Sequence, residues 1–126
     1  MTGGGCLCGL VRYEADAIQQ AFRACHCTLC RKWSGHFWAA FHVRDEDFRL
    51  LSDAGLTWFA SSNHASRGFC AKCGSSLFFR LSDAEGIEVA AGSADSTDGA
   101  RLVGHTHVAF KGDYYDLNDG LTQSAE

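Results

Sequence analysis

The chain has 126 residues and a formal net charge of −4 at pH 7, with seven cysteines and no proline. This length is typical of one domain with its own core, so we expect residues 1–126 to form a single domain. A mildly acidic chain without a basic stripe is a poor match for nucleic acid, and no apolar run is long enough to span a bilayer. The first ten residues lack the basic and apolar regions of a secretion signal. We therefore expect a cytoplasmic protein without nucleic-acid or membrane partners.

Short segments of alternating polarity follow one another along the chain and predict β-strands. In residues 11–14, Val11 and Tyr13 alternate with charged side chains, and in residues 36–43 the odd and even positions form two separate faces. Further short apolar runs occupy residues 48–51, 56–60, 76–81, 87–91 and 105–110, with turn-prone segments between them. No stretch keeps a helical period beyond a turn or two, and the residues after Cys27 are predicted as a single turn. Many short strands at close spacing predict an all-β sandwich or open barrel.

The cysteines fall into three groups along the chain. In a protein that is not secreted, closely spaced cysteines are typical of metal ligands or reactive thiols rather than disulfides. The groups are Cys6 with Cys8, Cys25 with Cys27 and Cys30, and Cys70 with Cys73.

The first and third groups predict one closed zinc site. In an extended segment residues i and i+2 point the same way, so the pair Cys6 and Cys8 presents two sulfurs to one side. Cys70 and Cys73 form a C-x-x-C turn followed by Gly74, which can adopt positive φ, as in metal-binding knuckles. Two such pairs make a tetrahedral zinc site; the alternative is four separate reduced thiols in the core.

The second group, C-x-C-x-x-C, supplies three sulfurs from one short segment. Three protein ligands with one open position are typical of a catalytic zinc, where the fourth place holds water or substrate. In one alternative Cys27 and Cys30 pair instead with Cys70 and Cys73, as in a zinc ribbon. In another a histidine closes the site as Cys3His, and the candidates are His26, His36, His42, His64, His105 and His107.

Basic residues near the cysteines are candidates for supporting roles. Arg31 and Lys32 follow the third sulfur directly and are predicted either to contact a substrate carboxylate and lower thiolate pKa values or to form a solvated pair. Arg67 is predicted to support the metal site or to lie on the surface. His105 and His107 are predicted to be strand residues that share one face.

Three motifs in this order, GGGCLCGLVRYE, CHCTLCRKWSG and RGFCAKCGSSLFFR, resemble the glutathione-dependent formaldehyde-activating enzymes and the wider CENP-V-type zinc-binding domain family. The likeness runs from about Gly4 to Gln123. It implies an Mss4-like, all-β fold of layered antiparallel sheets with zinc-binding knuckles, and two zinc ions per chain. It also implies that the structural zinc ligands are Cys6, Cys8, Cys70 and Cys73 and that the catalytic zinc ligands are Cys25, Cys27 and Cys30.

The resemblance implies a carbon–sulfur lyase that interconverts glutathione and formaldehyde with S-(hydroxymethyl)glutathione, so a small thiol and an aldehyde are the expected partners. An open zinc can act on the aldehyde oxygen or on the thiol sulfur, and the sequence does not choose between them. The family signatures His-x-Trp and Lys-x-Pro-Trp here read His105-Thr106-His107 and Lys111-Gly112-Asp113-Tyr114, and Thr122 replaces a proline. These departures do not affect the cysteines, but they bear on which thiol is the substrate.

Two other functions remain compatible with the cysteine pattern. One is a zinc-stapled binding module without catalysis, and the other is a redox or metal-buffering site that releases zinc on oxidation. The leading prediction is a zinc-dependent carbon–sulfur lyase that acts on a thiol–aldehyde adduct.

Overall fold

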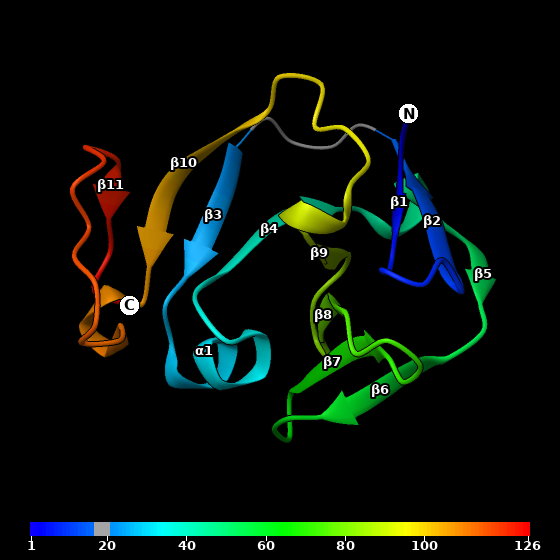
Figure 1. The fold of residues 1–126 in the computed structure, drawn as a ribbon, viewed down its shortest axis with the longest axis horizontal. Helices are drawn as coiled ribbons and strands as arrows, with labels where there is room; N and C mark the ends of the chain where they lie inside the picture. The colour runs from blue at the N-terminus through cyan, green and yellow to red at the C-terminus, as the bar shows by residue number, and fades with distance from the viewer. Residues whose placement is uncertain (17–20) are drawn as a thin grey trace.

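The computed structural model describes residues 1–16 and 21–126 and consists mainly of short β-strands (Figure 1). A three-stranded sheet has the order β1-β2-β5, and an eight-stranded sheet has the order β11-β10-β3-β4-β9-β8-β7-β6. The strands are β1 (Thr2–Gly5), β2 (Val11–Ala15), β3 (Ala21–Cys25), β4 (Trp38–Val43), β5 (Phe48–Asp53), β6 (Leu56–Ala60), β7 (Ala65–Cys70), β8 (Ser76–Leu81), β9 (Ile87–Ala90), β10 (Arg101–Thr106) and β11 (Thr122–Gln123). The all-β prediction is confirmed.

The core lies between the two sheets. Tyr13 of β2 packs edge-on against Phe78 of β8, with ring centroids 5.7 Å apart, and both side chains are fully buried. The Tyr13 hydroxyl lies 2.7 Å from Ser93 Oγ, so its polar end has a hydrogen-bond partner. Full burial of one such side chain contributes about 1.5–3 kcal/mol. This packing holds the β1–β2 hairpin against the larger sheet.

Strand β4 shows how the predicted alternation serves both the core and the site. Phe41 and Val43 are buried in the main core. Trp38, Ala40 and His42 lie on the opposite face and line a cavity. The two faces predicted for residues 36–43 therefore have different roles.

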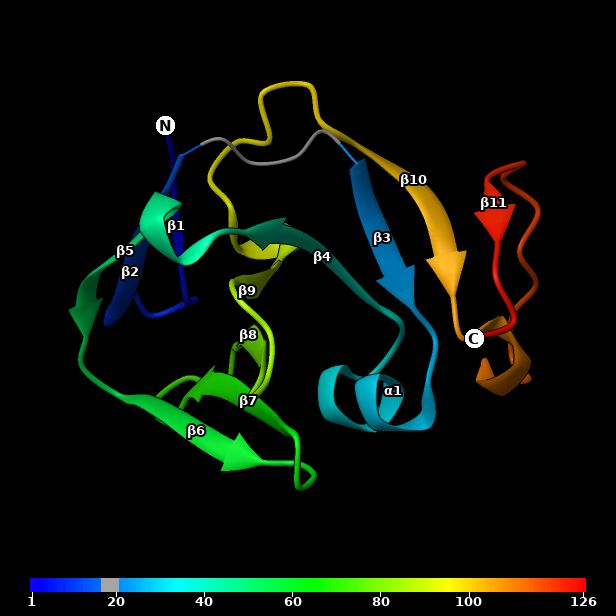
Figure 2. The same cartoon turned by 180° about the vertical axis from the view of Figure 1, so that it is seen from behind.

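The expected antiparallel arrangement holds for most strand pairs but not for β10, which pairs parallel with both β3 and β11. In the sheet, β4 and β3 separate β9 from β10, so the chain must cross the sheet between these two strands. Residues 91–100 make this crossing, and β10 then runs in the same direction as β3 (Figures 1 and 2). Alternating polarity is the same in parallel and antiparallel strands, so it does not predict strand direction.

The residues after Cys27 form a seven-residue helix, α1 (Thr28–Ser34), rather than the predicted single turn. The Cys27 sulfur accepts a hydrogen bond from the Cys30 backbone N–H at the N-terminus, and Gly35 ends the helix in the left-handed region at φ 91°. Three 3-10 turns, η1 (Asp45–Asp47), η2 (Ala91–Ser93) and η3 (Val108–Phe110), complete the elements. In the part of the chain that the structure describes, no helix has the length and apolar character needed to cross a membrane.

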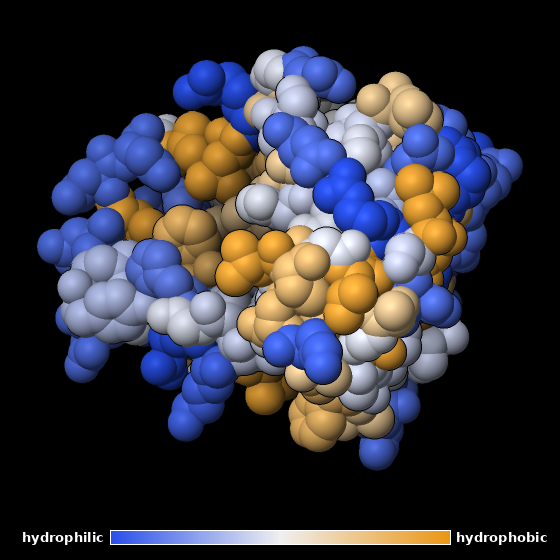
Figure 3. All heavy atoms as spheres, turned by 45° about the vertical axis from the view of Figure 1, so that its right-hand side comes forward, coloured by the Kyte–Doolittle hydropathy of each residue, from blue (hydrophilic) through white to orange (hydrophobic). Residues whose placement is uncertain are grey.

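Apolar side chains gather on the face that carries β5 and β6 (Figure 3). Leu51 of β5 and Phe59 of β6 are 58% and 59% exposed. These strands are the edge strands of the two sheets, and they follow each other directly in the chain. The exposed patch is therefore a feature of the sheet edges and not of the core.

Candidate metal centres

Four cysteines from two turns of the chain meet beside the main core. The sulfurs of Cys6, Cys8, Cys70 and Cys73 all lie within 4.8 Å of one another. The Cys6–Cys8 and Cys8–Cys70 sulfur distances are 3.6 and 3.8 Å. Tetrahedral zinc with Zn–S bonds of about 2.3 Å places its sulfurs about 3.8 Å apart. The four thiols therefore fit a closed zinc site.

Both turns of this cluster contain a glycine in the left-handed conformation that the sequence predicted for Gly74. Gly9 and Gly74 adopt φ values of 84° and 82°, in the left-handed region that favours glycine. Each glycine donates its backbone N–H to the carbonyl of the first cysteine of its turn. A hydrogen bond from the Ser75 hydroxyl helps to lower the pKa of Cys73 to about 5, which favours the thiolate that a metal binds.

The other three cysteines form a second cluster, called the tripod below. Cys25 is the last residue of β3, Cys27 caps α1, and Cys30 lies in the first turn of α1. Their sulfurs also lie within 4.8 Å of one another. A hydrogen bond from Cys30 lowers the pKa of Cys25 to about 4, and this partnership together with burial raises the pKa of Cys30. Three soft sulfur donors in this arrangement suit zinc.

The structure brings the cysteines together as four and three. Cys27 and Cys30 do not join Cys70 and Cys73 in either cluster of mutually close sulfurs. The zinc-ribbon alternative is therefore not the arrangement found.

His107 lies beside the tripod but does not complete a four-ligand set. Its Nδ1 is 3.5 Å from the Cys25 sulfur, yet among the described residues only the three sulfurs form the group of mutually close donor atoms. The prediction that His107 shares a strand face with His105 is wrong. β10 ends at Thr106, and His107 adopts a left-handed backbone with φ 56° and ψ 36°, which turns the chain away from the strand.

A cavity of about 380 Å³ adjoins the tripod, and all three of its cysteines line it. Its apolar wall includes Trp38 and Phe79. Besides the cysteines, its charged or titratable lining residues are Arg23, His42, Arg67, Glu88 and His107. Both the volume and the mixture of apolar walls with a few polar groups are typical of small-molecule sites.

Arg67 is the buried cation of this cavity, and its side chain is only 4% exposed. Nη1 donates a hydrogen bond to the Cys30 sulfur at 3.4 Å, and Nε donates to Ser61 Oγ at 3.2 Å. The guanidinium carbon lies 5.1 and 5.0 Å from the ring centroids of Trp33 and Phe79. The sequence offered two roles for Arg67, and the structure places it beside the tripod rather than on the surface.

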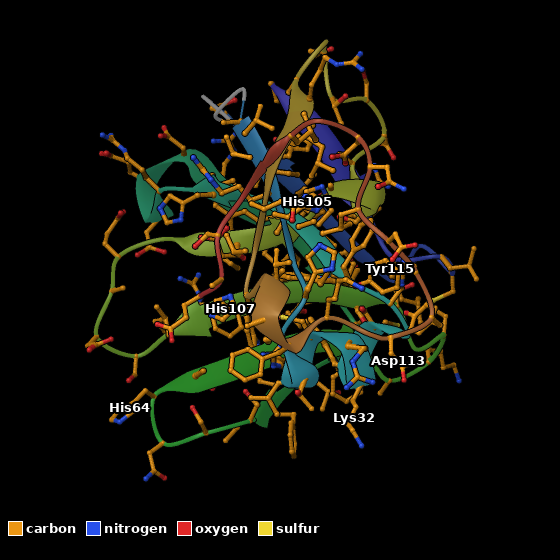
Figure 4. The ribbon with its side chains drawn as sticks, turned by 90° about the vertical axis from the view of Figure 1, so that its left-hand side faces the viewer. Lys32, His64, His105, His107, Asp113 and Tyr115 are labelled. Carbon is orange, nitrogen blue, oxygen red and sulfur yellow. The ribbon has the colours of Figure 1, made fainter. Side chains whose placement is uncertain are left out.

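Arg31 and Lys32 do not line this cavity. They lie in the last turn of α1, where positive charge favours the helix dipole, and Lys32 is exposed (Figure 4). A substrate contact by Arg31 or Lys32 stays a prediction. The cationic residues that the structure does place in the cavity are Arg23 and Arg67.

A chain of hydrogen bonds behind the tripod was not predicted. His26 lies between Cys25 and Cys27 in the chain and is fully buried. Its Nδ1 forms a hydrogen bond with the Tyr115 hydroxyl, and its Nε2 lies 2.8 Å from His105 Nδ1. His105 Nε2 in turn lies 2.7 Å from Asp119 Oδ2. Burial lowers the pKa of His26. Figure 4 shows His105 and Tyr115 where the C-terminal segment passes in front of β10, so this segment is tied to the tripod loop.

Residues 1–109 match the model of the glutathione-dependent formaldehyde-activating enzyme family. The chain belongs to this family. All seven cysteines of this family member, together with Arg67 and His107, lie within the matched residues, whereas Tyr115 and Asp119 lie beyond them. The match thus ends just before the segment in which Lys111 to Tyr114 depart from the family signature.

Two further proteins are similar to this family member. An uncharacterized lyase of Schizosaccharomyces pombe is 32% identical over 76 residues, which are 60% of this chain and 55% of that protein. The chain therefore matches only about half the length of this relative. A crystal structure of a Rhodobacter sphaeroides protein has a TM-score of 0.65 and 28% identity, covering 76% of this chain and 90% of that one.

Proposed function

We propose that this chain is a zinc-dependent carbon–sulfur lyase that acts on the adduct of a thiol and an aldehyde, such as S-(hydroxymethyl)glutathione. The observation that carries the proposal is the tripod, because three clustered thiols line a cavity large enough for a small molecule. The family description names glutathione and formaldehyde, and one relative is named a lyase. Two zinc ions are proposed, one held by Cys6, Cys8, Cys70 and Cys73 and one by Cys25, Cys27 and Cys30.

The proposed reaction makes or breaks one C–S bond and transfers one proton between sulfur and oxygen. In the forward direction a C–S bond forms between the thiol sulfur and the carbonyl carbon, the C=O π bond breaks, and the thiol proton ends on the oxygen. The reverse direction breaks the C–S bond and restores the aldehyde. Zinc held by the tripod supplies Lewis acidity for this chemistry.

The cavity residues bind and orient the substrate in this proposal. Trp38 and Phe79 form an apolar wall that limits the access of water to the reacting atoms. Arg23 precedes Cys25 by two residues on β3, so both side chains lie on one face about 7 Å apart along the strand. Arg23 is exposed, has no ion pair among the described residues, and is proposed to hold a carboxylate of a glutathione-like thiol.

Exchange NMR tests the proposal directly. Formaldehyde and glutathione form their adduct without an enzyme, and exchange spectroscopy measures how fast free and adduct forms interconvert. We expect the zinc-loaded protein to accelerate this exchange by at least about 100-fold, the lower end of the contribution of one well-placed catalytic group. Cys27→Ser is expected to abolish the acceleration.

An unchanged exchange rate with glutathione and with several other thiols would contradict the proposal. The cysteine clusters would then support the non-catalytic alternative, a binding module held together by zinc.

A further inference from the structure

The charge of Arg67 is buried without a carboxylate partner. The ion pairs found in the described part of the chain place Arg12, Arg44, Arg49 and Arg80 beside acidic side chains near the surface, but none includes Arg67. A buried charge is costly unless an opposite charge compensates it. The ionisable group that Arg67 contacts is the Cys30 sulfur, which carries the compensating negative charge when the tripod cysteines are thiolates, as zinc binding requires.

The surroundings of Arg67 hold its guanidinium in one orientation. The rings of Trp33 and Phe79 lie at about equal distances from the guanidinium carbon. Ser61 accepts a hydrogen bond from Nε. A planar guanidinium makes such stacking contacts and still donates in several fixed directions, which an ammonium group cannot do. These contacts therefore favour an arginine over a lysine at position 67.

One nitrogen of this guanidinium remains available to a ligand. Nε and Nη1 have partners, whereas no hydrogen bond of Nη2 is found among the described residues. In the described residues, the fully buried side-chain nitrogen or oxygen atoms without a hydrogen-bond partner are Arg31 Nε and Trp38 Nε1. Arg67 Nη2 is not one of them, so it is not fully buried. Arg67 lines the tripod cavity, so the nitrogen for which no partner is found belongs to a side chain that borders the proposed substrate site.

We propose that Arg67 is a catalytic residue that holds the Cys30 sulfur with Nη1 and donates a hydrogen bond from Nη2 to the oxygen of the aldehyde-derived group. This inference rests on the proposed lyase function. When the adduct breaks, its hydroxyl proton passes to the departing thiol, the C–S bonding electrons stay on the sulfur, and the oxygen forms the C=O bond. Negative charge on that oxygen is largest in the transition state, so a fixed donor there accelerates both directions.

The test compares Arg67→Met and Arg67→Lys with the wild-type, zinc-loaded protein. Zinc affinity of the tripod is measured by competition with a chromophoric chelator, and kcat and KM for the adduct are measured at saturating zinc. Arg67→Met is expected to weaken zinc binding by about 10–100-fold, because it removes a partner of a metal ligand. It is also expected to lower kcat by about 100–1,000-fold while KM changes by less than about threefold.

The lysine variant separates charge from geometry. Arg67→Lys keeps the positive charge but loses the fork of donors, so zinc affinity is expected to recover to within about tenfold of wild type while kcat stays at least about tenfold low. A structural role alone would lower stability and zinc binding but leave kcat unchanged at saturating zinc. Circular dichroism of each variant checks that it is folded.

Two other arginines provide matched controls. Arg80→Met removes a half-buried arginine that pairs with Asp45 outside the tripod cavity, and it is expected to leave zinc affinity, kcat and KM unchanged. Arg23→Met removes a cation of the cavity for which no hydrogen bond to a cysteine is found in the described residues. It is expected to raise KM without changing zinc affinity.

Wild-type zinc affinity and kcat in Arg67→Met would overturn the inference. If the wild-type protein itself shows no catalysis, the proposed function fails, and the donor role of Nη2 fails with it. The zinc-affinity measurement then still decides whether Nη1 supports the tripod.

Discussion

At the scale of single residues, the tripod depends on side chains that each perform two tasks. Cys27 is a proposed metal ligand, and its sulfur also caps α1 by accepting the Cys30 backbone N–H. Arg67 contacts a tripod sulfur and lines the cavity. The spacing of the cysteines indicates a metal site, but it does not show which atoms hold the ligands in place.

The double role of Cys27 predicts different effects for two substitutions. Cys27→Ser and Cys27→Ala both remove the sulfur, and both are expected to lose tripod zinc. Serine is a good N-cap and alanine is a poor one, so the alanine variant is expected to be less stable than the serine variant by about 1 kcal/mol. Urea unfolding of the two variants, both with the four-cysteine site loaded, measures this difference. Equal stabilities would show that the cap does not contribute.

At the scale of elements, the C-terminal segment matters because it carries partners for buried groups. Tyr115 bonds to the buried His26, whereas its neighbour Tyr114 bonds to His36 at an exposed position. Adjacent tyrosines therefore make the same kind of contact in two different environments. A lost partner costs more in the buried environment, because water cannot replace it.

This contrast predicts that Tyr115→Phe destabilises the protein and that Tyr114→Phe does not. Tyr115→Phe leaves the His26 Nδ1 without its partner and is expected to lower the free energy of unfolding by about 1–3 kcal/mol. Tyr114→Phe is expected to change it by less than about 0.5 kcal/mol, since water can hydrate His36. Chemical denaturation of the two variants side by side measures both values. A similar loss in both would mean that the buried network adds nothing to stability.

The element scale also shows why some predictions were wrong. A seven-residue helix is too short for its periodicity to be recognised, so α1 was predicted as a turn. The direction of β10 depends on the path of residues 91–100 across the sheet, which local alternation does not encode. His107 leaves the strand because its backbone is left-handed, a conformation that is uncommon outside glycine and that alternating polarity does not reveal.

At the scale of the whole molecule, the four-cysteine cluster links the two sheets. Cys6 and Cys8 lie in the turn between β1 and β2 of the small sheet. Cys70 is the last residue of β7 in the large sheet, and Cys73 lies in the turn between β7 and β8. A zinc ion in this cluster would tie together segments more than sixty residues apart. The tripod, by contrast, draws its sulfurs from six consecutive residues and joins β3 only to the helix that follows it.

The two clusters are therefore expected to respond differently to mutation. Structural zinc contributes about 10–16 kcal/mol of apparent binding free energy in small zinc domains, comparable with the total stability of a domain of about 5–15 kcal/mol. Cys70→Ser is thus expected to abolish the cooperative unfolding transition at room temperature, whereas Cys27→Ser keeps it. Thermal unfolding followed by circular dichroism, with zinc content measured on the same samples, tests the contrast. A cooperatively folded Cys70→Ser protein without zinc in that cluster would contradict it.

The sequence alone determined the β-rich class, the grouping of the cysteines and the family resemblance, because these depend on local spacing and on short motifs that are continuous in the chain. Only the tertiary structure decided that β10 is parallel to β3, that Arg67 contacts Cys30 from a strand nearly forty residues away, and that His26 bonds to Tyr115. These features depend on which distant segments become neighbours. Long-range packing selects those neighbours, and the spacing of residues along the chain does not reveal them.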